Sequence, residues 1–174
     1  MGFLVAFITC AGAVSAALAV YYLSSGNHNI LLDTEGARQF AVQSDHAGRE
    51  ICCSCLIPLA NKGEQQGMVN NVFCQPVYGG KIMNDLEIRA HLRLAAEEKR
   101  ENSYWKSVIL KKNDCLTTEL ELVVRSRVDL SALLGALPRV KVLIYYQVVG
   151  RKGIQWKLAE ITMPLERKQK KVVE

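Results

Sequence analysis

The most reactive side chains of this chain are its cysteines, and three of them fall in one short segment. Cys52, Cys53 and Cys55 form the pattern C-C-x-C, and Cys74 and Cys115 follow further along. Thiolates bind soft ions such as Cu(I) and Zn(II). If the segment is a strand, Cys53 and Cys55 share one face, while Cys52 points to the other. The pattern therefore predicts a copper or zinc site made by Cys53, Cys55 and Cys74.

The same cysteines allow two further interpretations. Because five cysteines follow the N-terminal segment, they cannot all pair with one another. One disulfide, such as Cys52 or Cys53 to Cys74, is an alternative, and buried thiols acting as small apolar side chains are another. In the last case the protein needs no cofactor. The candidates for a disulfide are Cys52, Cys53, Cys74 and Cys115.

Cys53-Ser54-Cys55 resembles the C-x-C motif of membrane-tethered copper chaperones for oxidase assembly. The resemblance implies a thiol-based metal or redox module that uses the segment from Cys52 to Cys55. The aromatic residues of that family's motif are absent from this sequence.

Other reactive patterns are missing. The sequence has no G-x-S-x-G, P-loop, G-x-G-x-x-G or H-E-x-x-H motif. His28, His46 and His91 are too scattered to bind one metal ion, and we expect all three to be exposed. Glu119 and Glu121 would share one strand face, which we expect to be solvated. We therefore assign no catalytic residue and expect a non-enzymatic protein.

The N-terminal segment is uncharged and apolar. No Asp, Glu, Lys or Arg occurs before residue 28, and about 20 apolar residues in a helix rise roughly 30 Å, the thickness of a bilayer core. Tyr21 and Tyr22 would lie among the lipid headgroups. This predicts a transmembrane helix over residues 1–24, with residues 3–23 contacting lipid. As a signal anchor, the helix would leave the remaining domain on the extracytoplasmic side of the membrane.

Two other interpretations of this segment remain. Small residues at positions 13–19 are compatible with a cleaved secretory signal. Gly2-Phe3 resembles a type IV pilin processing site, but Phe7 stands where pilins carry a glutamate.

The rest of the chain alternates apolar and polar residues with a period of two, which is typical of half-buried strands. The alternation predicts a strand over residues 86–94, with a helix continuing to residue 100 as the rival. The segment 150–153 (G-R-K-G) predicts a tight hairpin turn between strands 139–149 and 154–163. A short helical turn is expected at 129–134. Further strands are expected at 29–33, 37–44, 49–59, 66–77, 108–111 and 116–125.

These strands predict a mainly β protein. Arg49 to Leu59, the turn from Ala60 to Glu64 and the strand from Gln66 to Val77 together resemble immunoglobulin-like sandwich ectodomains. In that turn, we expect Asn and Gly to adopt left-handed backbone geometry. The expected fold is an immunoglobulin-like sandwich of about seven to nine antiparallel strands, preceded by one transmembrane helix. The expected organisation is a helix over 1–24, a linker with first strands over 25–48, the sandwich over 49–165 and a basic tail over 166–174.

The formal net charge of +5 arises in part from the C-terminal tail. Without it the chain is nearly balanced, so we expect no nucleic-acid partner. In the tail, Lys168, Lys170 and Lys171 are candidates for contact with anionic lipid headgroups. The sequence thus predicts a membrane-anchored interaction or scaffold module that binds another protein of the cell envelope or of a membrane complex. The alternatives are the thiol-based metal or redox module and a lipid-binding sandwich.

Overall fold

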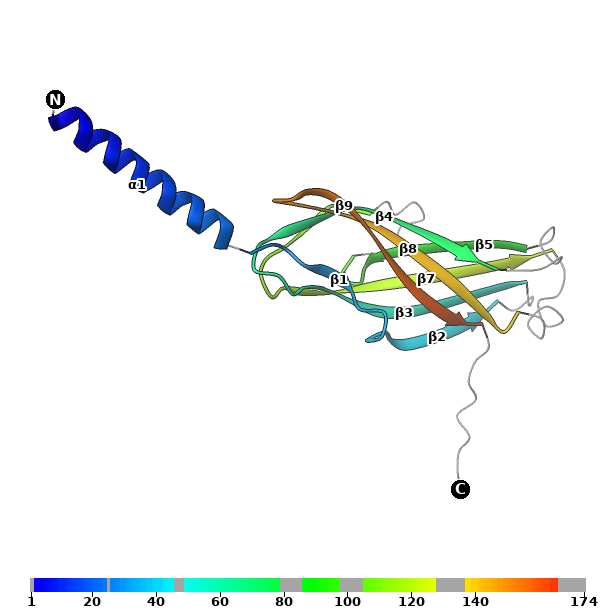
Figure 1. Cartoon of the computed structure of the whole chain (residues 1–174). Coiled ribbons are helices and arrows are strands. Elements are labelled where there is room, and N and C mark those ends of the chain that lie inside the picture. The colour runs from blue at the N-terminus through cyan, green and yellow to red at the C-terminus, as the bar shows by residue number, and fades with distance from the viewer. Residues whose placement is uncertain are drawn as a thin grey trace, which may run out of the picture.

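The structure, a computed structural model, describes residues 2–24, 26–45, 49–78, 86–97, 105–127 and 137–165. Within these ranges, one helix precedes a series of strands (Figure 1). The elements are α1 (Gly2–Ser24), β1 (Ile30–Leu32), β2 (Arg38–Ser44), β3 (Glu50–Asn61), β4 (Gly67–Val77), β5 (Leu86–Leu94), β6 (Val108–Leu110), β7 (Cys115–Ser126), β8 (Arg139–Gly150) and β9 (Gly153–Pro164).

The strands form two antiparallel sheets that pack face to face. The five-stranded sheet has the order β1-β3-β7-β5, and β2 pairs with β3 on the same side as β1. The four-stranded sheet has the order β6-β4-β8-β9. The expected mainly β, antiparallel sandwich behind one apolar helix is therefore confirmed.

The core forms between the sheets because alternate residues of each strand point inward. In β3 every second residue is buried, and β7 and β8 have the same alternation. Most of the buried side chains are aliphatic. Those that are almost completely buried include Ile57, Leu59, Leu120, Leu122, Val142 and Ile144.

The segment 86–94 is a strand, as its alternation predicts, and the helical interpretation is wrong. β5 pairs with β7 over its whole length, from Leu86 opposite Ser126 to Leu94 opposite Thr118. A strand places Ala90 and Leu92 in the core together, whereas a helix would turn them to different sides.

The predicted hairpin is present at β8 and β9. Gly150 pairs with Gly153 across a two-residue turn, and Gly153 has a φ of 90° that suits glycine. The link at residues 62–66 joins β3 to β4 and crosses from one sheet to the other. The helical turn expected at 129–134 and the tail lysines Lys168, Lys170 and Lys171 lie outside the described residues, as does His46.

The helix α1 extends away from one end of the sandwich (Figure 1). Its 23 residues span about 34 Å. Gly2–Tyr22 has a mean hydropathy of 2.3, so this segment is long and apolar enough to cross a membrane. None of it is buried against the described residues, so α1 is not a core helix of the sandwich.

Candidate functional site

The cysteines of β3 alternate between its two faces, as the sequence predicts. Cys53 and Cys55 are buried between the sheets, and the Cys55 Sγ lies 3.5 Å from the Met163 Sδ. Cys52 points outward and donates a hydrogen bond to the Glu121 Oε1 at 3.2 Å. Burial raises the pKa of the Cys53 thiol and that of the Cys55 thiol to about 12. Both thiols therefore stay protonated at neutral pH, which disfavours metal binding.

Cys74 does not join this pair. It faces inward from β4, close to the backbone of Leu92 on β5, and burial raises its pKa to about 12. In the five-stranded sheet β7 separates β5 from β3, so Cys74 lies about two strand spacings, roughly 10 Å, from the side of Cys53 and Cys55. Zinc requires sulfurs about 2.3 Å from one ion. Among the described residues, no three His, Cys, Asp or Glu side chains gather closely enough to bind a metal ion.

The structure also forms none of the candidate disulfides. All six cysteines are within the described residues, and none of them forms a disulfide. Cys52 points out of the five-stranded sheet and Cys74 points into the core from the other sheet, so these two cannot pair. Cys115 is exposed at the start of β7. The arrangement fits thiols that pack in the core, and it does not assemble the predicted metal site.

A more unusual feature is a group of exposed apolar side chains on the outer face of the four-stranded sheet, which also carries the Lys141–Glu160 ion pair. Phe73 is 59% exposed, Trp156 58% and Leu158 57%. Ile109 and Ile154 are exposed on the same face. We call these five residues the apolar face. Among the described residues after α1, the other exposed large hydrophobic residues are Phe40 and Val77.

Strand register arranges the apolar face in rows across the sheet. One row runs from Ile109 through Met68 and Val149 to Ile154. A second row runs from Phe73 through Tyr145 to Leu158, and the Phe73 and Tyr145 ring centroids lie 6.2 Å apart. Contiguous apolar rows, unlike scattered apolar side chains, are typical of binding surfaces.

A row of amides and one indole lies between the two apolar rows. Asn71 pairs with Gln147, which pairs with Trp156. The Gln147 Oε1 accepts hydrogen bonds from the Nδ2 atoms of Asn70 and Asn71, at 3.1 and 3.2 Å. These bonds keep the amides within the sheet surface, so they interrupt the apolar rows without adding charge.

The outer face of the five-stranded sheet has the opposite character. It carries charged residues that pair along and across strands, including Arg89 with Glu87 and Arg125 with Glu50. Glu119 and Glu121 share this face, as predicted, but Glu119 is not fully solvated. Its carboxylate pairs with Arg93, and their side chains are only 17% and 10% exposed. The outer face of the five-stranded sheet is therefore the more charged of the two.

A shift in the sequence pattern of β9 marks the apolar face. Apolar residues occur at the even positions Ile154, Trp156 and Leu158 and then at the odd positions Ile161 and Met163. The structure buries the odd positions, so the even ones point outward. The strand was predicted from the sequence without a choice of inner and outer face, although this shift is a local sign of it.

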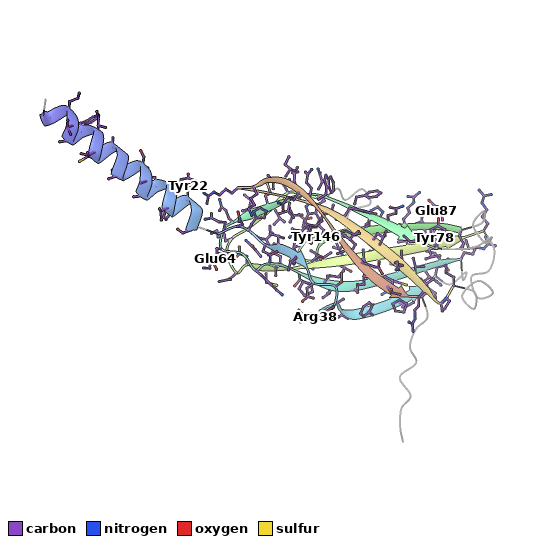
Figure 2. The ribbon with its side chains drawn as sticks, in the orientation of Figure 1. Tyr22, Arg38, Glu64, Tyr78, Glu87 and Tyr146 are labelled. Carbon is purple, nitrogen blue, oxygen red and sulfur yellow. The ribbon has the colours of Figure 1, made fainter. Side chains whose placement is uncertain are left out.

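The end of the sandwich next to α1 contains polar residues whose surroundings differ from the prediction. Figure 2 shows Tyr22 and Glu64 at this helix-proximal end, with Tyr78 and Glu87 at the opposite end. His28 is only 8% exposed, so the expectation that it is solvated is wrong. Its ring lies against Gly150, where a Cβ would overlap it. His91 is exposed, as expected.

The turn at residues 60–64 is built differently from the prediction. Neither Asn61 nor Gly63 has a positive φ. Gly63 is required because a Cβ there would overlap the backbone of residues 27–29. Asn61 is buried, and its side chain bonds to neighbouring loops. Both residues serve close packing at the helix-proximal end.

Together these features define a class of protein, an antiparallel β-sandwich with an N-terminal apolar helix and one apolar outer face. Neither the protein-family models nor the curated protein sequences match this chain. Several solved structures show a limited similarity to it.

The ApaA protein from Bordetella pertussis is 11% identical, with a TM-score of 0.44 over 80% of this chain and 96% of its own. The CooA pilin subunit from enterotoxigenic Escherichia coli is 12% identical, with a TM-score of 0.40 over 81% and 99%. The GAE domain of GGA2p from Saccharomyces cerevisiae is 8% identical, with a TM-score of 0.38 over 80% and 99%. These likenesses concern the fold alone, and no functional argument rests on them.

Proposed function

We propose that this protein is a membrane-anchored, non-enzymatic binding module. In this proposal α1 is a single-pass signal anchor, and the sandwich lies on the extracytoplasmic side of the membrane. The sandwich binds another protein of the cell envelope or of a membrane complex. The observation that carries the proposal is the exposed apolar face of the four-stranded sheet.

The two outer faces offer a partner different amounts of binding energy. Burying a Leu, Ile or Phe side chain stabilises a complex by about 1.5–3 kcal/mol. The exposed side chains of Phe73, Trp156 and Leu158 thus offer several kcal/mol to a partner that covers them. The other face, with Arg89 and Arg125 in ion pairs, is compatible with water and offers little.

Trp156 is the expected centre of the interface. Tryptophan is enriched among the residues that dominate binding energy, because it buries a large area and keeps an N–H for a polar partner. It lies at the end of the amide row, between Ile154 and Leu158 on the outer face of β9. Since β9 is an edge strand of its sheet, a partner can approach Trp156 from the side as well as from above.

Site-specific cross-linking in native membranes tests the proposal. The full chain carries a photoreactive phenylalanine derivative in place of Trp156, and a matched chain carries it in place of Arg89 on the charged face. We expect one discrete protein adduct from position 156 and none from position 89. Adding Leu158→Arg to the first chain should abolish the adduct, because a charge would be buried in the interface.

Two results would overturn the proposal. One is the absence of an adduct from position 156 under conditions in which the chain is intact and membrane-bound. The other is an adduct that forms equally from position 89 or survives Leu158→Arg.

A further inference from the structure

A cavity lies where α1 meets the sandwich. Its volume is about 490 Å³, and it is open to one side. The residues that define its character are Tyr21, Tyr22, Gln66, Met68, Ile109 and Arg151. It thus combines a cationic group and amide donors with an apolar wall.

Arg151 links the hairpin turn to the end of α1. Its guanidinium carbon lies 4.3 Å from the centroid of the Tyr22 ring, within cation–π distance. The rings of Tyr21 and Tyr22 lie 6.4 Å apart and nearly perpendicular. The apolar span of α1 ends at Tyr22, so the cavity sits where a bilayer's headgroup layer begins.

The loops around the cavity are basic. The helix-proximal end is formed by residues 62–66, 111–114 and 150–153. These loops carry exposed basic side chains at Lys62, Lys111, Lys112, Arg151 and Lys152, against the acidic residues Glu64 and Asp114. Lys112 pairs with Glu64.

The three loops are far apart in the sequence. A count of the basic residues that directly follow α1 therefore does not include their lysines and arginine. The fold brings the three loops to one end, where Asn61 bonds to two of them. The buried ring of His28 lies near these basic side chains. Its pKa is lowered first by burial and then by Lys157 and Lys152.

Apolar side chains lie beside these basic loops at the helix-proximal end. Ile109 and Ile154 are 61% and 66% exposed and begin the apolar face nearest the cavity. Apolar side chains beside basic ones and tyrosines are typical of surfaces that rest in the interfacial layer of a membrane. In water this row would be unfavourably solvated.

We propose that the helix-proximal end of the sandwich docks on anionic phospholipid headgroups, with the cavity beside Tyr22 and Arg151 receiving a headgroup phosphate. The inference rests on the proposed role of α1 as a membrane anchor. Arg151 and Lys152 supply the charge from one loop, and Lys111 and Lys112 supply it from another. The docked sandwich is held against the bilayer rather than swinging on the segment after α1.

Hydrogen exchange of the full chain in lipid vesicles tests this inference. The chain is reconstituted in phosphatidylcholine alone or with about one third phosphatidylglycerol. Docking should slow amide exchange in residues 111–114 and 150–153 in the anionic vesicles only. Each basic side chain near an anionic surface strengthens the contact about fivefold, so the slowing should be tenfold or more.

Matched double variants locate the contact. Arg151→Ala with Lys152→Ala should remove most of the slowing, and so should Lys111→Ala with Lys112→Ala on the separate loop. Arg127→Ala with Arg139→Ala removes the same charge at the opposite end and should leave it intact. Phosphatidylcholine vesicles with added inorganic phosphate separate a headgroup at the bilayer from a free anion.

The outcomes distinguish this inference from the proposed function. Equal exchange in the two vesicle types, loss of the slowing in the opposite-end variant, or full slowing by free phosphate would each overturn the inference while leaving the anchor intact. If the chain fails to float with vesicles of either type, the anchor itself is wrong and the inference falls with it.

Discussion

Asn61 shows how one side chain fastens the helix-proximal end of the sandwich. Its Oδ1 accepts hydrogen bonds from the backbone N–H groups of Asn29 and Gly63, both at 3.0 Å. Its Nδ2 donates to the carbonyls of Gln65 at 2.7 Å and Leu110 at 3.2 Å. One amide therefore holds together three segments: the residues before β1, the β3–β4 link and the end of β6.

Replacing this amide should destabilise the protein. Asn61→Ala leaves several backbone groups at a buried site without partners, and we expect the free energy of unfolding to fall by about 2–4 kcal/mol. Asn71→Ala removes an exposed amide with one bond to Gln147 and should cost less than about 1 kcal/mol. Urea denaturation of the full chain in detergent measures both. Equal losses would contradict the role of Asn61.

His28 should make stability depend on pH. Among the described residues, its Nδ1 is buried without a hydrogen-bond partner, and its pKa in the folded chain is lowered from 6.5 by burial, Lys157 and Lys152. The unfolded chain therefore takes up a proton first as the pH falls. The stability from a neutral His28 is present above about pH 6.5 and is lost as the pH falls below it.

We expect His28→Gln to flatten the pH dependence of the unfolding free energy below about pH 6.5, because the variant has no ring to protonate. His91→Gln changes an exposed ring that stays in water in both states, so it serves as the control. Denaturation curves between about pH 5 and 7.5 provide the measurement. A wild-type slope in the His28 variant would show that the buried ring is not the responsible group.

At the scale of the element, β3 determines which thiols can react. Cys53 and Cys55 face the core, and a pKa of about 12 leaves only about one thiol in ten thousand as thiolate at pH 8. Cys115 is exposed at the start of β7. In the folded chain, a maleimide should label Cys115 quickly, and Cys53 and Cys55 only after unfolding.

Peptide mass mapping after timed labelling gives the three rates separately. Labelling of Cys53 in the folded chain as fast as that of Cys115 would contradict the position of β3 in the core. Added Zn(II) should not change the labelling of Cys53, since among the described residues no three His, Cys, Asp or Glu side chains gather closely enough to bind it.

Local patterns along the sequence predicted the strands well because they depend on neighbouring residues. The alternation in β5 and β7 and the glycines at the β8–β9 turn needed no knowledge of the other sheet. The separation of Cys74 from Cys53 and Cys55 could not be predicted, because it depends on which strand of one sheet lies over which strand of the other. Alternation with a period of two predicts that Cys74 faces inward, but it does not predict whether β3 or β5 lies opposite.

The burial of His28 and the outward direction of the apolar residues of β9 also depend on how the two sheets pack together, which local patterns do not specify. His28 precedes β1, and the glycines at positions 67 and 150, on two other strands, leave room for its ring. The apolar residues of β9 alternate as expected for a strand. Which of its two faces points inward depends on how its sheet packs against the other sheet. A change of phase between Leu158 and Ile161 was the one local sign of it.

At the scale of the whole molecule, the sandwich is suited to water, whereas the surface of α1 is suited to a bilayer. The sandwich closes its own core, whereas α1 exposes an apolar surface that no described residue covers. Phe3, Leu4 and Phe7 are among its exposed side chains. A helix satisfies its own backbone hydrogen bonds, so a bilayer can solvate this surface at little cost. Anchoring is therefore the role of α1 in the proposed function.

Carbonate extraction of membranes that contain the full chain tests that role most directly. We predict that the chain stays in the pellet at about pH 11, with an intact mass that still includes residues 2–24. Val14→Arg with Leu18→Arg should release it, because charges near a bilayer centre cost about 2.5–3.5 kcal/mol each. Arg89→Glu on the sandwich should not. Release of the unaltered chain into the supernatant, or a membrane-free product lacking α1, would contradict the account.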